Sequence, residues 1–108
     1  MDRTVCLWNT LDGTIVQRMA CHANLVVGVA FSPDGLSLAT CSWDKLIKVW
    51  DVPSSYWYPA GDLEVRLKRV LVGHQQAVCS VCWCLEGGRG WLASGCRGGT
   101  IKLWDLRE

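Results

Sequence analysis

The sequence has almost no net charge and no long apolar run. Its 11 basic and 10 acidic side chains leave a formal net charge of +1 at pH 7, so its charge does not favour nucleic acid or an acidic membrane surface as a partner. No apolar stretch approaches the ~20 residues that a helix needs to span a bilayer. The opening residues 1–4 lack the basic-then-apolar order of a signal peptide. We therefore expect no nucleic-acid partner and no membrane partner.

The cysteine pattern lacks both a disulfide framework and a metal motif. There are seven cysteines, an odd number, and most lie inside apolar runs. Such cysteines are typical of reduced, buried side chains in an intracellular protein, either cytoplasmic or nuclear. Cys79, Cys82 and Cys84 are closely spaced, but on a strand Cys79 and Cys82 would project to opposite faces and could not share one zinc ion. The sequence predicts no bound metal and no cofactor.

An internal repeat dominates the sequence. Residues 22–51 align with residues 74–105, with a histidine at the start and a Trp-Asp pair at the end of each copy. The N-terminal segment 2–9 matches the end of the longer copies, so a third, truncated copy opens the chain. Extra residues fall within 53–63 and near 86–90, and we interpret both as loops at the end of the repeated unit.

Each copy shows the pattern of short β-strands. The runs 26–31, 37–42 and 47–52 are rich in Val, Ile, Leu, Trp and Thr, and turn residues separate them. The segment 33–35, Pro-Asp-Gly, suits a tight turn because proline presets φ and glycine accepts a positive φ. The sequence therefore predicts an all-β chain.

Three features together resemble the WD-repeat family. They are the histidine ahead of the first strand in each copy (His22 and His74), the Phe-Ser-Pro-Asp-Gly segment at 31–35, and the closing Trp-Asp pair. The resemblance covers essentially the whole chain and implies a partial β-propeller of four-stranded antiparallel blades. It implies strands near residues 4–9, 13–20, 26–32, 37–42, 47–52, 64–72, 78–84, 91–96 and 100–106.

The resemblance also implies that the propeller is incomplete. Residues 1–20 would supply strands c and d of a first blade, 21–72 a complete second blade with an insertion at 53–63, and 73–108 strands a to c of a third. A closed propeller has four to eight blades, and repeats bury their cores against neighbours. We expect a fragment or short isoform of a larger propeller, with exposed blade edges that the rest of a propeller or self-association would cover.

In this family a buried hydrogen-bonded tetrad holds each blade together. Its matched members are His22, Thr40, Asp44 and Trp50 in the second blade, and His74, Ser94 and Trp104 in the third. Gly98 stands where the third blade should have its aspartate, so we expect His74 to lack a carboxylate and the third blade to be weaker. Histidine, aspartate and a hydroxyl also occur in hydrolase triads, but here each fits a repeated structural role. We expect no catalytic residues and no enzymatic activity.

The resemblance implies that partners bind on the rims of the propeller. The matched candidate positions are Leu25, Val27 and Trp43 in the second blade, and Ala77, Cys79 and Arg97 in the third. The inserted loop adds three aromatic candidates, Tyr56, Trp57 and Tyr58. Packing of these side chains against a neighbouring blade stays open as an alternative. The sequence thus favours a non-catalytic protein–protein interaction scaffold that binds other proteins or peptides; the alternative is a cysteine-based redox or metal-responsive module.

Overall fold

The computed structural model describes residues 3–8, 13, 15–52, 65–86 and 89–105. Within these ranges every regular element is a β-strand, and there is no helix long and apolar enough to cross a membrane. The strands are β1 (Thr4–Trp8), β2 (Ile15–Ala20), β3 (Val26–Phe31), β4 (Ser37–Ser42), β5 (Leu46–Asp51), β6 (Arg66–Val72), β7 (Val78–Glu86), β8 (Arg89–Cys96) and β9 (Ile101–Asp105). The predicted all-β fold is confirmed.

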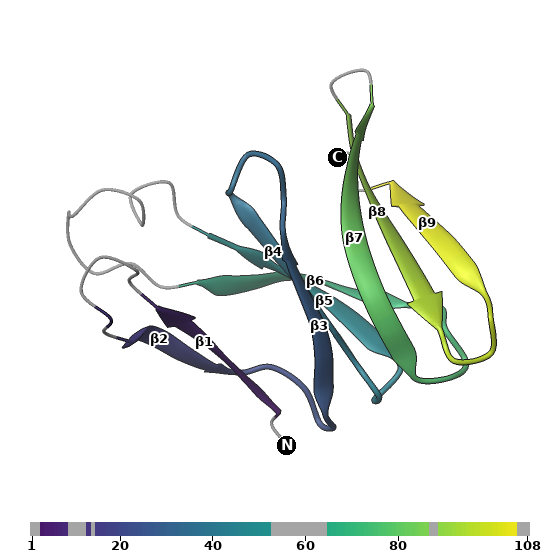
Figure 1. Ribbon diagram of the computed structural model, residues 1–108, viewed down its shortest axis with the longest axis horizontal. Coiled ribbons are helices and arrows are strands. Elements are labelled where there is room, and N and C mark those ends of the chain that lie inside the picture. The colour runs from purple at the N-terminus through teal and green to yellow at the C-terminus, as the bar shows by residue number, and fades with distance from the viewer. Residues whose placement is uncertain (1–2, 9–12, 14, 53–64, 87–88, 106–108) are drawn as a thin grey trace.

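The strands form three antiparallel sheets in chain order. The first sheet is β1-β2, the second is β3-β4-β5-β6 and the third is β7-β8-β9. Figure 1 shows the three sheets side by side, with the complete second sheet in the middle. Each strand pairs with its neighbour in sequence, so every sheet is a meander whose strands are joined by short local connections.

The second and third sheets repeat the same pairing. In each, the first hairpin contains a register shift at an equivalent place, between Val26 and Gly28 in the second sheet and between Val78 and Ser80 in the third. A shift of this kind bends a strand and increases its local twist. The repeat seen in the sequence is therefore also a repeat of backbone geometry.

The turn between β3 and β4 has the geometry that the sequence predicts. Gly35 adopts a φ of 74° and donates its N–H to the Ser32 carbonyl at 2.9 Å. The Asp34 carboxylate accepts hydrogen bonds from the Ser32 hydroxyl at 2.6 Å and from the Leu36 N–H at 2.9 Å. These bonds favour the ionised carboxylate and lower the pKa of Asp34.

The hairpin of the third sheet corrects one expectation. The extra residues near 86–90 were expected to form a loop, but β7 and β8 continue to pair as far as Glu86 opposite Arg89. The corresponding hairpin of the second sheet ends its pairing at Phe31 opposite Leu38. The added residues lengthen the hairpin because antiparallel pairing can extend outward from an existing ladder. The other insertion, at 53–63, lies outside the described residues.

Two apolar clusters join the sheets, one on each side of the second sheet. The cluster between the second and third sheets contains the buried residues Ala39, Cys41, Ile47, Val49, Leu71, Val78 and Leu92. The cluster between the first and second sheets contains Met19, Cys21, Leu38, Trp50, Val52 and Val65. Polar contacts add to them, since the Trp83 indole donates to the Ala30 carbonyl at 2.9 Å. The second sheet is therefore buried on both faces.

Gly28 lies at the closest approach of the second and third sheets. A Cβ atom there would stand 2.7 Å from the buried Cys41 Sγ and 3.7 Å from the Ser80 Cα. We expect Gly28→Ala to lower the free energy of unfolding by about 1–3 kcal/mol, because the packed neighbours cannot move aside. Urea unfolding measures this change. Gly95→Ala is the matched control, since its Cβ would meet Ser80 Oγ at an ordinary 3.5 Å; equal losses would contradict the prediction.

Candidate functional site

A chain of hydrogen bonds links four segments of the second sheet. The Trp50 indole N–H donates to Thr40 Oγ1 at 3.1 Å, and Thr40 Oγ1 lies 2.8 Å from His22 Nε2. His22 Nδ1 lies 2.9 Å from Asp44 Oδ2. An indole can only donate, so the hydroxyl accepts from Trp50 and gives its own proton to Nε2. The remaining imidazole proton sits on Nδ1 and is donated to the carboxylate.

The Asp44 carboxylate also binds the backbone around it. It accepts the Ala23 N–H at 3.2 Å and the Leu46 N–H at 2.9 Å. Burial acts to raise the pKa of Asp44, but these bonds and His22 lower it overall. Burial lowers the pKa of His22, although the carboxylate opposes this effect. At neutral pH the pair is therefore an ionised aspartate beside a neutral histidine.

The third sheet contains only part of this arrangement. The Trp104 indole donates to Ser94 Oγ at 2.9 Å, and Ser94 Oγ lies 2.6 Å from His74 Nε2. The Trp104 and His74 rings meet edge to face with centroids 6.3 Å apart. His74 Nδ1 is buried and has no hydrogen-bond partner among the described residues. Burial and the nearby Lys102 lower the pKa of His74.

The backbone confirms that Gly98 takes the place of Asp44. The residue after each is left-handed, with a φ of 76° at Lys45 and 87° at Gly99. The two turns therefore have the same shape, and the difference between them lies in the side chain. The sequence comparison predicts this exchange, although it does not predict what fills the space.

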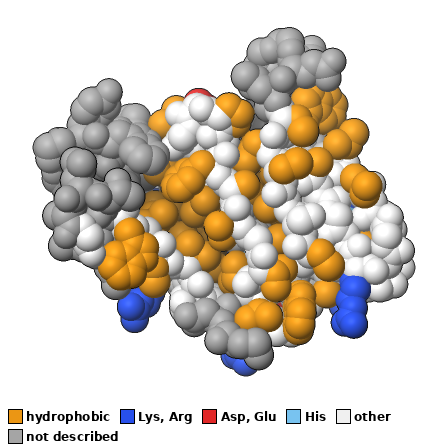
Figure 2. All heavy atoms as spheres, viewed as in Figure 1, with side chains coloured by type: hydrophobic (Ala, Val, Ile, Leu, Met, Phe, Trp, Pro, Cys, Tyr) orange, Lys and Arg blue, Asp and Glu red, His pale blue; other side chains and the backbone are white. Residues whose placement is uncertain are grey.

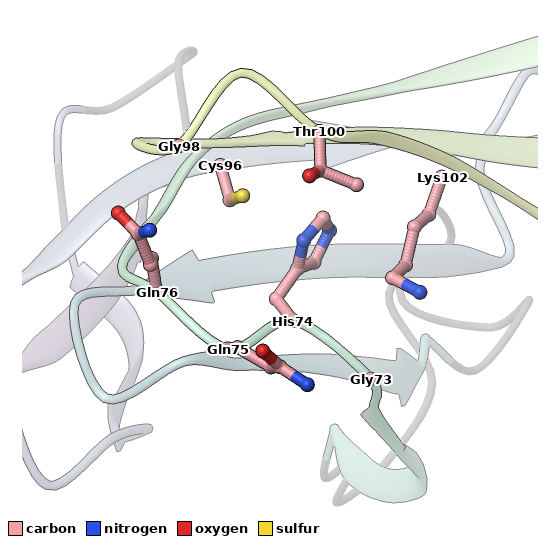
Figure 3. A pocket seen from close by; sticks show the side chains of 8 residues that line it. All are labelled: Gly73, His74, Gln75, Gln76, Cys96, Gly98, Thr100 and Lys102. Atoms are coloured by element: carbon pink, nitrogen blue, oxygen red, sulfur yellow. The ribbon is translucent and has the colours of Figure 1, made fainter.

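A polar pocket of about 280 Å³ lies where the third carboxylate would be (Figure 3). It is lined by Gly73, His74, Gln75, Gln76, Cys96, Gly98, Thr100 and Lys102. Burial acts to raise the pKa of the Cys96 thiol, but hydrogen bonds from the Gly98 and Thr100 backbone lower it overall. Sequence reasoning missed Cys96 and Lys102 as site residues, because the only signal for them was the glycine at position 98.

The structure brings two pairs of predicted partner-binding residues together on one rim. The Trp43 N–H donates to the Leu25 carbonyl at 3.1 Å, and the Arg97 N–H donates to the Ala77 carbonyl at 2.9 Å. Trp43 is 45% exposed. The turns 43–45 and 97–99 lie along the lower edge of Figure 1, together with the segments that lead into β3 and β7. We call this edge the lower rim.

The other predicted partner-binding residues have different surroundings. Val27 is only partly exposed and packs against the cluster between the second and third sheets. Cys79 is exposed and close enough to Cys41 to raise the pKa of that buried thiol, for which burial is the main cause, to about 12. The aromatic candidates Tyr56, Trp57 and Tyr58 lie outside the described residues.

The cysteines of the described ranges form no disulfide. Burial also raises the pKa of Cys21, so this thiol stays protonated at neutral pH. Among the described residues, no group of three or more His, Cys, Asp or Glu side chains is arranged to hold a metal ion.

Comparison with known families agrees with this geometry. The family model described as WD domain, G-beta repeat, matches residues 13–51 and 65–105, which is more than half of the chain. The chain belongs to the WD-repeat family. In the terms of this family the three sheets are propeller blades, and the hydrogen-bonded chain through His22 is the blade tetrad.

Several curated WD-repeat proteins are similar to this chain over most of its length. Apoptotic protease-activating factor 1 of Rattus norvegicus is 30% identical over 99% of this chain and 8% of its own length. The ribosome biogenesis protein WDR12 homolog of Drosophila erecta is 33% identical over 97% of this chain and 27% of its own length. The guanine nucleotide-binding protein subunit beta of Saccharomyces cerevisiae is 46% identical over 41% of this chain and 10% of its own length. The chain thus spans roughly a quarter or less of the length of these relatives.

Loss of the second-blade histidine should destabilise the protein more than loss of the third-blade histidine. His22→Ala leaves both Thr40 and Asp44 without their histidine partner, whereas His74→Ala affects only Ser94. A buried polar group without its partner costs roughly 1–3 kcal/mol, so we expect the two losses to differ by about that amount. Urea unfolding followed by tryptophan fluorescence measures both variants. Equal losses of stability would contradict the prediction.

Proposed function

We propose that the chain is a non-catalytic scaffold that binds other proteins or peptides on its lower rim. The observation that carries this proposal is Trp43, a large apolar side chain that is 45% exposed beside the second blade's tetrad turn. Tryptophan is enriched among the residues that dominate binding energy at interfaces. Family membership supports the proposal, because WD-repeat proteins act in general as protein-interaction scaffolds.

We infer further that the protein works inside the cell, in the cytoplasm or the nucleus. The described cysteines form no disulfide, and two of them, Cys21 and Cys41, are buried as small apolar side chains. Disulfides are rare in the cytosol and nucleus, where thiols are kept reduced.

We also propose that the outer face of the third blade takes another blade, supplied by a longer propeller or by a second chain. Ile101 and Leu103 on β9 are 76% and 68% exposed. Their equivalents on β5, Ile47 and Val49, are 0% and 2% exposed because the third sheet covers them. The repeat thus shows within one chain what covers such a face.

The Trp43 surface can be tested with selected peptides. A peptide enriched by display panning on the intact chain should lose at least about tenfold in affinity with Trp43→Ala or with Trp57→Ala, the aromatic of the inserted loop, since one anchor residue contributes that much. Isothermal titration calorimetry measures the affinity. Trp8→Ala is the matched control, because Trp8 is 57% exposed at the other end of its strand. Unchanged binding in both variants, or an equal loss in the control, would overturn the proposal.

The exposed face of the third blade can be tested by sedimentation velocity. We expect the chain to self-associate as its concentration rises, because a large apolar sheet face is unfavourable in water. Replacing Ile101 and Leu103 with lysine should restore the monomer. Replacing the exposed Leu67 and Val72 of β6 with lysine is the matched control and should not. A cooperatively folding monomer at every concentration would contradict the proposal.

A further inference from the structure

The pocket of the third blade contains a buried hydrogen-bond donor with nothing to receive its proton. Trp104 donates to the Ser94 hydroxyl, so the hydroxyl proton goes to His74 Nε2. The neutral imidazole therefore carries its own proton on Nδ1. His74 is only 6% exposed, and no described residue accepts this proton. A buried unsatisfied donor is costly, which favours a ligand that supplies an acceptor.

The rest of the lining adds donors and positive charge. Lys102 brings an ammonium group, and Thr100 brings a hydroxyl (Figure 3). The Gln76 amide nitrogen would stand 2.8 Å from a Cβ at Gly98, so it occupies the edge of the space that an aspartate would take. No carboxylate is present among the eight lining residues. With about 280 Å³ against roughly 30 Å³ per water molecule, the pocket has room for a small acidic group.

We propose that this pocket binds a carboxylate, carried by an acidic side chain of a protein partner, in the place that Asp44 holds in the second blade. This proposal rests on the proposed scaffold function and names the chemistry of the partner. The second blade shows how a carboxylate is held there, by His22 Nδ1 and by the N–H groups of Ala23 and Leu46. The equivalent residues of the third blade, His74, Gln75 and Thr100, all line the pocket.

The charge of the lower rim suits an acidic partner. Arg3, Lys45 and Arg97 lie on this rim, whereas Asp34 and Asp51 lie at the opposite edge of the sheets. In the face that Figure 2 shows, the Lys and Arg side chains lie along the lower edge and the acidic atoms at the upper edge. A basic rim around a recessed site attracts acidic segments and aligns them as they approach.

Sodium acetate tests the pocket without any partner. With ¹⁵N-histidine labelling at neutral pH, acetate should shift the His74 ring nitrogens saturably, because Nδ1 gains a charged acceptor. His22 is the internal control, since its Nδ1 already binds Asp44. Sodium chloride at equal ionic strength is the salt control. No shift at His74, or equal shifts at both histidines, would overturn the proposal.

Blocked tripeptides identify the source of the carboxylate. Acetyl-Gly-Glu-Gly-amide should shift the His74 signals, and its neutral counterpart acetyl-Gly-Gln-Gly-amide should not. Acetyl-Gly-Gly-Gly with a free terminal carboxylate is the third probe. A response to the terminal carboxylate alone would overturn the assignment to a side chain. A response to acetate beside unchanged partner binding in Trp43→Ala separates this proposal from the scaffold proposal, because the pocket then stands without that rim contact.

Variants at position 98 test the same site from within the chain. Gly98→Asp places a carboxylate in the pocket, and the backbone there has no positive φ that would resist a side chain. It should abolish the acetate response, while Gly98→Asn, the neutral control of matched size, should reduce it less. Lys102→Gln, outside the turn, should weaken acetate binding about tenfold through the lost charge. Full acetate binding in both Gly98→Asp and Lys102→Gln would overturn the proposal.

Discussion

Packing of each sheet against the next is the constraint on which the whole structure depends. No sheet here is large enough to bury its own apolar side chains, so each relies on a neighbour. The second blade meets this condition on both faces, with Ile47 and Val49 covered by the third sheet and Leu38 by the first. Gly28 allows the second and third sheets to approach closely. The outer face of the third blade, through Ile101 and Leu103, has the same chemistry without the same cover.

The tetrad depends on this packing and in turn fixes the local geometry. Its hydrogen bonds are strong only where water is excluded, and in the second blade they tie together a leading loop, two strands and a turn. In the third blade the same hydroxyl and indole contacts persist through Ser94 and Trp104, and the turn keeps its shape at Gly99. One missing side chain therefore changes the chemistry of the site and leaves its frame in place.

Much of this could be predicted from the sequence because the chain repeats. Alignment of the two long copies predicts the strands and the positions of His22 and His74, and it predicts that Gly98 replaces an acid. It could not predict that residues near 86–90 extend a hairpin, since strand and loop compete there with little difference in local preference. It also could not predict the pocket beside Lys102, whose lining residues converge only through the folding of two separate segments.

The two blades therefore divide structure and recognition between them. The second blade satisfies His22 internally through Asp44, so its stability needs no ligand. The third blade leaves the proton of His74 without an acceptor, so its stability depends on what occupies the pocket. A ligand that binds only the folded state adds stability in proportion to the logarithm of its concentration over its dissociation constant. A bound carboxylate would thus order the third blade as it binds, and the loss of one aspartate would couple partner binding to the folding of the surface that receives it.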